Sequence, residues 1–324
     1  MSTTSPRLPA AQDLGHGITC IDTEQQRPGL ACCYLLQHGG EAALIECGTS
    51  HGVPGLLARL EQMGIAREQV RYLIPTHVHL DHAGGAGRLM RELPNAQLVA
   101  HPRGARHLID PSKLIAGATA VYGEAAMQAI YGEILSADES RMIVADDGYR
   151  LNLAGRELVF IDSPGHARHH FSVWDAVSQG FFTGDTFGLS YRAFDGPAGP
   201  WLMPTTTPVQ FEPEAWERTL DRYLSYAPQR MYLTHYGAVD EVPRLAHELR
   251  AGLIDYQHLA MSVEARGADR QPAIKQALYD WSFAELRRRR VDIPEALARE
   301  WLEFDLDLNA QGLVVWLDKQ QSAQ

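Results

Sequence analysis

Three histidines and one aspartate fall within residues 76–82, which read Thr-His-Val-His-Leu-Asp-His. In an extended segment His77, His79 and Asp81 point to one side, because successive side chains alternate between two faces. His82 lies at the turn into a predicted helix and can reach an adjacent position. Imidazole and carboxylate groups are ligands for zinc, iron and manganese. Buried without a metal, such a cluster would carry a large desolvation penalty, so we predict a metal site here.

Ligand-type residues also follow three later segments that have the character of strands. A predicted strand at 157–161 runs into a Pro-Gly turn and His166, another at 180–183 leads to Asp185, and one at 230–234 leads to His235. Each is weak evidence alone, because a single histidine after a strand is more often packed or on the surface. Their shared position at strand ends, after residues 76–82, predicts that they complete a ligand set.

This pattern resembles the metallo-β-lactamase superfamily of metallohydrolases over roughly residues 18–238. The resemblance implies an α/β fold, an αββα sandwich with a pair of metals at one edge. It implies that His77, His79 and His166 bind the first metal. It also implies that Asp81, His82 and His235 bind the second, while Asp185 bridges the two. The expected cofactor is two divalent ions, with Zn2+ preferred and Fe or Mn as alternatives.

The sequence departs from the family pattern at two places. Where the family often has Asp-Thr-Gly after an early strand, this chain has Glu46, Cys47 and a glycine. We expect Glu46 to support the metal cluster at a longer reach, and Cys47 to be available for contact with a ligand. Residues 165–170 replace the motif GHTPGH: His170 matches its second histidine and His169 is extra. Whether these two support the metals or lie on the surface stays open at this stage.

Patterns of apolar residues indicate which elements position these groups. Residues 1–16 are expected to be a flexible N-terminus, and residues 17–238 a catalytic domain of mixed strands and helices. Apolar residues recur at helical spacing from residue 239 to the end, which predicts a helical C-terminal region at 239–324. One helix-rich stretch is expected at 118–135.

The predicted C-terminal appendage resembles that of glyoxalase II, a thioester hydrolase in which it helps bind glutathione. Its two histidines, His247 and His258, would lie about 16 Å apart along a helix, too far to share an ion. We therefore expect the appendage to shape substrate access rather than supply metal ligands. The irregular residues 188–208, rich in Gly, Pro and aromatic residues, are a candidate wall for the substrate or a packed loop.

Composition limits the partners. The chain has 324 residues and a formal net charge of −11, which argues against nucleic acid and anionic membranes as partners. No apolar run is long enough to span a membrane, and no signal-peptide pattern is present. The four cysteines contain no CxxC pair and are expected to be reduced core residues, so a cytoplasmic location is predicted. The partner is expected to be a small-molecule substrate; the oligomeric state stays open, with a homodimer as one option.

The predicted activity is hydrolysis by a hydroxide that bridges two divalent metals. Asp81 is the predicted catalytic residue, orienting the hydroxide and carrying its proton to the leaving group. A carboxylic ester, thioester or lactone is the preferred substrate, with a phosphodiester less favoured. A true β-lactamase and a ribonuclease are disfavoured, by the helical appendage and the acidic charge respectively.

Two other classes stay open. One is a mononuclear iron sulfur dioxygenase, a branch that resembles this set but would use only His77, His166 and Asp185. The other is a ligand-sensing protein that keeps the metals without useful turnover. Metal content discriminates between two zinc-like ions and one iron.

Overall fold

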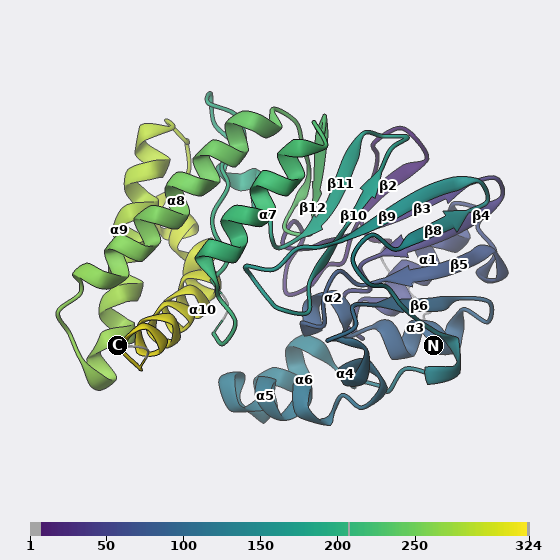
Figure 1. Cartoon of the computed structure of the whole chain (residues 1–324), viewed down its shortest axis with the longest axis horizontal. Helices are drawn as coiled ribbons and strands as arrows, with labels where there is room; N and C mark the ends of the chain where they lie inside the picture. The colour runs from purple at the N-terminus through teal and green to yellow at the C-terminus, as the bar shows by residue number, and fades with distance from the viewer. Residues whose placement is uncertain (1–7, 207, 323–324) are drawn as a thin grey trace, which may run out of the picture. The chain divides into compact units, whose positions relative to one another are not determined.

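The computed structural model describes residues 8–206 and 208–322 (Figure 1). Within them the chain folds into two units. The first unit comprises residues up to 162, 169–184 and 229–238, and it carries the two β-sheets. The second comprises residues 163–168, 185–228 and those from 239 onward, and it is helical. Of the N-terminal segment predicted to be flexible, residues 1–7 lie outside the described residues, and Ala11–Asp13 forms an exposed strand.

The first sheet has seven strands in sequence order, and its later strands are parallel. They are β1 (Ala11–Asp13), β2 (Ile18–Asp22), β3 (Cys32–His38), β4 (Glu41–Ile45), β5 (Val70–Ile74), β6 (Gln97–Ala100) and β7 (Met142–Val144). Because β4 and β5 run parallel, the residues that follow them meet at one edge of the sheet. Glu46 and residues 76–82 therefore start from the same edge.

The second sheet has six strands in the order β13-β12-β11-β10-β9-β8. They are β8 (Arg150–Leu153), β9 (Arg156–Asp162), β10 (Phe171–Asp175), β11 (Gly180–Gly184), β12 (Arg230–Leu233) and β13 (Gly237–Val239). The pair β11 and β12 is parallel, so the residues that follow Gly184 and Leu233 leave the sheet at the same edge.

Alternating side chains of the first sheet face two different cores. On β3, Tyr34 and Leu36 pack with Phe160 and other apolar residues of the second sheet. Cys33 and Leu35 face the opposite way, toward helices α1 (Val53–Gln62) and α3 (Ala86–Glu92). The adjacent Cys32 and Cys33 thus lie on opposite faces, as their place in a strand predicts.

Further helices of the first unit follow β5 and β6. They are α2 (Leu80–Ala83), α4 (Ala105–Ile109), α5 (Ser112–Tyr122) and α6 (Glu124–Tyr131). The helix-rich stretch expected at 118–135 is two helices, divided at Gly123. The backbone φ of Gly123 is +79°, a left-handed value that ends α5, and the sequence periodicity does not reveal this break.

The second unit contains α7 (Pro213–Ser225) and the C-terminal appendage, which is helical as predicted. The appendage consists of α8 (Val242–Ser262), α9 (Arg270–Arg288) and α10 (Glu295–Ser322). The predicted α/β architecture with a helical C-terminal appendage is confirmed. No helix in the part of the chain that the structure describes has the length and apolar character needed to cross a membrane.

The irregular segment after Asp185 packs inside the second unit. Tyr191 and Phe194 lie against the ring of Trp301 on α10, and Trp201 lies against Trp281 on α9. These loop side chains are 1–3% exposed. For these three side chains the packed-loop alternative holds, because their apolar surface covers the inner faces of the appendage helices.

Candidate metal centre

The segment after β5 is extended only as far as His79. The prediction that Asp81 shares one face of an extended segment with His77 and His79 is wrong, because the backbone turns into helix α2 at Leu80 and Asp81 and His82 lie on that helix. The backbone at His79 has φ −60° and ψ 147°, and helix α2 begins at the next residue. Val78 and Leu80, which alternate with the ligand-type residues, are buried in two apolar clusters. His77 Nε2 lies 2.8 Å from His79 Nδ1.

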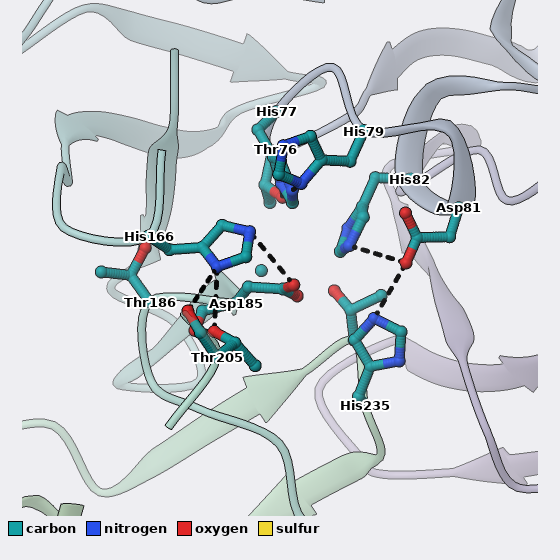
Figure 2. A network of polar contacts seen from close by, with 12 residues as sticks. Thr76, His77, His79, Asp81, His82, His166, Asp185, Thr186, Thr205 and His235 are labelled. Atoms are coloured by element: carbon teal, nitrogen blue, oxygen red, sulfur yellow. Dashed lines mark hydrogen bonds and ion pairs between the residues drawn. The ribbon is translucent and has the colours of Figure 1, made fainter. Parts of the chain in front are cut away.

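Asp81, His82 and His235 form a compact group within the first unit (Figure 2). Their ligand atoms lie within 4.8 Å of one another. Asp81 Oδ2 is 3.5 Å from His82 Nε2 and 3.3 Å from His235 Nε2. His82 and His235 are buried, whereas the Asp81 side chain is 22% exposed. One carboxylate and two imidazoles at this separation form a donor set that fits a divalent ion.

The hydrogen bonds of the two imidazoles determine which nitrogen can act as a ligand. His235 Nδ1 lies 2.8 Å from the carbonyl oxygen of Leu30, and His82 Nδ1 lies 3.0 Å from Glu46 Oε1. A carbonyl or carboxylate oxygen only accepts, so both Nδ1 atoms carry the proton. The Nε2 atoms, which face Asp81, are therefore the nitrogens available to a metal.

Glu46 connects the ends of several strands. Its Oε1 accepts hydrogen bonds from Thr76 Oγ1 at 2.6 Å and Thr234 Oγ1 at 2.9 Å, in addition to His82. Its Oε2 accepts from the backbone N–H of Thr76 at 3.1 Å. Glu46 therefore contacts His82 directly, as a group that supports the cluster would.

Thr76 extends this network to His77. Because the Thr76 hydroxyl donates to Glu46, its oxygen is the acceptor for His77 Nδ1 at 3.2 Å. His77 Nε2, which faces His79, is then the nitrogen available to a metal. Cys47 contributes through its backbone N–H, which donates to the His82 carbonyl at 2.7 Å. Burial and the Glu46 charge raise the pKa of the Cys47 thiol, which packs in the apolar core instead of acting as a thiolate.

The second unit holds His166 and Asp185. His166 Nε2 lies 3.4 Å from Asp185 Oδ2, and both side chains are buried (Figure 2). His166 Nδ1 lies 3.0 Å from the Thr205 carbonyl oxygen and 2.9 Å from Thr205 Oγ1. Since the carbonyl only accepts, Nδ1 carries the proton and Nε2 faces Asp185.

Backbone geometry fixes the approach to His166. Gly165 has a φ of +136°, and a Cβ atom there would lie 2.5 Å from Trp216 Cβ and 2.6 Å from its Cα. Trp216 is anchored by an Nε1–H bond to the Thr186 carbonyl at 2.6 Å. Glycine is therefore required before His166, because helix α7 leaves no room for a side chain.

His169 and His170, whose placement the sequence left open, are both buried in the first unit. The ring of His170 lies 4.9 Å from that of His77, and the His169 ring lies 5.4 Å from that of His79. They belong to the same imidazole cluster and not to the surface.

The structure thus gathers His77, His79, Asp81, His82 and His235 in the first unit, and His166 with Asp185 in the second. Sequence reasoning missed the threonines around them: Thr76 contacts His77, Thr205 contacts His166, and Thr234 contacts Glu46. Thr76 and Thr234 each directly precede a candidate histidine at a strand end, a signal that was available. Thr205 lies in an irregular segment and has no comparable signal.

Comparison with known proteins is consistent with this geometry. The family model "Metallo-beta-lactamase superfamily" matches residues 27–235. The chain therefore belongs to the metallo-β-lactamase superfamily, whose members are mostly metal-dependent hydrolases, as the resemblance of its motifs predicts.

Individual relatives are distant. The metallo-β-lactamase fold-containing protein ST1585 of Sulfurisphaera tokodaii is 24% identical over 246 residues, which are 74% of this chain and 85% of that protein. Its crystal structure matches with a TM-score of 0.65 at 22% identity, over 92% and 98% of the two chains. The family protein TTHA1429 of Thermus thermophilus matches with a TM-score of 0.66 at 19% identity, over 95% of both chains.

One partial relative has a named activity. The N-acyl homoserine lactonase AttM of Azorhizobium caulinodans is 30% identical over 118 residues. These residues are 36% of this chain and 40% of the lactonase.

Proposed function

We propose that this chain is a binuclear metal-dependent hydrolase that cleaves an ester-type bond in a small molecule: a carboxylic ester, a thioester or a lactone. The group formed by Asp81, His82 and His235 carries the proposal. Its two imidazoles have their Nδ1 protons engaged by Glu46 and Leu30, so their Nε2 atoms are set for a metal. This preorganisation is typical of metal sites, in which the outer partner fixes the ring of the ligand.

We assign the ligands as the family pattern orders them. His77, His79 and His166 would hold one ion; Asp81, His82 and His235 would hold the other; Asp185 would serve both. Divalent ions held there lower the pKa of bound water and polarise a carbonyl oxygen. Zn2+ is the proposed ion, because imidazole and carboxylate are among its common ligands. A cytoplasmic location is proposed because the four cysteines are buried free thiols, which suits a reducing compartment.

Asp81 is proposed as the group that handles the proton. It is partly exposed, whereas the imidazoles on either side of it are buried. Its carboxylate can therefore accept a proton from the attacking water and pass it to the leaving group. Asp81 Oδ2 lies between Nε2 of His82 and Nε2 of His235, so an ion held by the two imidazoles would also hold this carboxylate.

Two observations support an ester-type substrate. A lactone is a cyclic ester, and AttM, with which this chain shares a partial likeness, is named a lactonase. The net charge of −11 disfavours polyanionic substrates such as RNA.

Metal analysis of protein purified without added metal is the first test. The proposal expects two ions per chain, and hydrolysis of at least one member of a panel of carboxylic esters, thioesters and lactones. Asp81→Asn should lower turnover by at least about 100-fold, the contribution typical of a general acid or base. Asp292→Asn, at an exposed carboxylate on the C-terminal region, is the control and should leave turnover unchanged.

A single iron per chain with oxygen uptake would instead support the sulfur dioxygenase alternative. Two ions with no turnover across the panel would favour a ligand-sensing protein.

A further inference from the structure

One side chain of the C-terminal helix α10 holds the segment that carries Thr205. Asn309 Oδ1 accepts a hydrogen bond from the Thr206 backbone N–H at 2.6 Å, and Asn309 Nδ2 donates to the Pro204 carbonyl at 3.1 Å. The Thr206 hydroxyl adds a bond to the Asn309 carbonyl at 2.8 Å. Both ends of the amide are thus bound to the backbone, one residue before and one residue after Thr205.

The segment fixed in this way contacts both ligand-type residues of the second unit. The Thr205 carbonyl and hydroxyl lie 3.0 and 2.9 Å from His166 Nδ1. The same hydroxyl donates to the backbone carbonyl of Asp185 at 3.2 Å. Asn309, Thr205 and Thr206 are all at most 8% exposed, so water does not readily replace these bonds.

We propose that Asn309 is a positioning residue for His166: it fixes the Thr205 backbone, and this orients the imidazole and sets its tautomer. The proposal rests on the ligand role assigned to His166 above. Outer partners of this kind matter because losing one typically weakens metal binding by about 10- to 100-fold. Asn309 touches neither metal nor substrate in this scheme.

Other contacts keep α10 in place when Asn309 is changed. Tyr191 donates a hydrogen bond to Asp305 Oδ2 at 2.8 Å, and Trp301 packs against Tyr191 and Phe194. Trimming Asn309 should therefore act on residues 204–206 without releasing the helix. This separates the positioning role from a general effect on packing.

The proposal revises one expectation from the sequence. The appendage was expected to shape substrate access without supplying metal ligands, which implies that a variant ending at residue 238 keeps its metal affinity. That variant would also lose Asn309, so its affinity at the His166 site should fall even where the remaining chain stays folded.

Titration of the metal-free full-length protein with Zn2+ alone provides the first test. In Asn309→Ala, one of the two ions should bind about 10- to 100-fold more weakly, while affinity for the other stays within about twofold. Leu302→Ala is the matched control, because it removes a fully buried side chain from the same helix. It should lower the unfolding temperature and leave both Zn2+ affinities unchanged.

A second readout needs no metal. In histidine-labelled, metal-free protein, the Nδ1–H resonance of His166 should show a protected hydrogen bond in the wild type and shift or exchange faster in Asn309→Ala. If Asn309→Ala does not fold, Asn309→Asp keeps the shape and the Oδ1 acceptor but loses the donor to Pro204. The same resonance should then shift, and the same ion should bind more weakly.

The outcomes separate the two proposals. A wild type that binds no Zn2+ would refute the proposed function, while the His166 resonance would still decide the role of Asn309. An unchanged resonance in a folded Asn309 variant would overturn the positioning role. So would an equal loss of Zn2+ affinity in Leu302→Ala, since stability alone would then explain the effect.

Discussion

Glu46 Oε1 lies 3.0 Å from His82 Nδ1, and neither side chain is more than 1% exposed. The same oxygen accepts from two threonine hydroxyls, so one atom orients Thr76 after β5, Thr234 after β12 and His82 on α2. Glu46 adopts a φ of +70°, which is uncommon for a residue with a side chain. The network of hydrogen bonds holds this conformation in place.

Glu46→Gln should weaken Zn2+ binding at the His82 site by about 10- to 100-fold. A carboxylate has two acceptor oxygens, whereas an amide has one. The NH2 group of the variant must therefore face either the Thr76 backbone N–H or the donors that contact Oε1 in the wild type. Calorimetric titration of the metal-free variant measures the loss. Glu41→Gln, a half-exposed carboxylate at the other end of β4, should bind as the wild type does. Equal affinities in the two variants would count against the supporting role of Glu46.

Gly165→Ala should severely destabilise the second unit or displace His166. The added Cβ would overlap Trp216 at both its Cβ and its Cα, and a backbone atom cannot move aside as a flexible side chain does. Gly117→Ala is the contrasting variant, because Gly117 lies inside α5 with open space around it. That change should raise stability by about 0.5–1 kcal/mol. Urea unfolding of both variants tests this contrast, and a neutral Gly165→Ala would contradict the packing described.

Asp175 and Arg156 form a buried ion pair remote from the metal residues. Burial alone would raise the pKa of Asp175, but hydrogen bonds from Arg156 and Ser178 outweigh it and lower the pKa below the ordinary value. Asp175→Asn leaves the Arg156 guanidinium without its charge partner. It should lower the free energy of unfolding by about 3–5 kcal/mol at neutral pH. Asp221→Asn removes an exposed partner of Arg250 and should cost about 1 kcal/mol or less.

The effect of Asp175 should depend on pH in one direction. A carboxyl whose pKa is lowered by folding stabilises the protein above its unfolded value of about 3.9, and the stabilisation is lost as pH falls through the folded value. The difference in the free energy of unfolding between wild type and Asp175→Asn should be largest near neutral pH and should decrease below about pH 4. A gap that widens in acid would show that the sign of the pKa shift is wrong.

Removing metal should leave the secondary structure intact. The Nδ1 atoms of His82, His166 and His235 are held by Glu46, Thr205 and Leu30, which are protein groups. Chelation should leave the far-ultraviolet circular dichroism unchanged, and added Zn2+ should raise the unfolding temperature. At free Zn2+ near 100 times Kd, one site contributes about 2.7 kcal/mol. Loss of the dichroism signal on chelation would contradict this prediction.

The fold class and the ligand-type residues could be predicted because their signals are local. Three histidines and an aspartate lie close together in residues 76–82, and apolar runs reveal most strands. Alternation places His77 and His79 but not Asp81, because helix α2 begins at Leu80. The division of residues 118–135 into two helices escaped this reasoning, since apolar residues continue on both sides of Gly123.

The supporting contacts could not be predicted because they join distant parts of the chain. Thr76 and Glu46 are separated by 30 residues, and Asn309 and Thr206 by 103. Neither pair has a spacing rule that would indicate contact. Burial of His169 and His170 depends in the same way on tertiary packing.

The bonds between Asn309 and residues 204–206 also determine where this protein can be cut and recombined. A chimera that exchanges only the helices from residue 239 onward would separate the amide from the backbone groups it binds. The part of the chain exchanged in a chimera must therefore also include the segment that follows Asp185, with its buried Tyr191 and Thr205. Breakpoints for domain shuffling therefore belong on either side of that segment as well as before the helices.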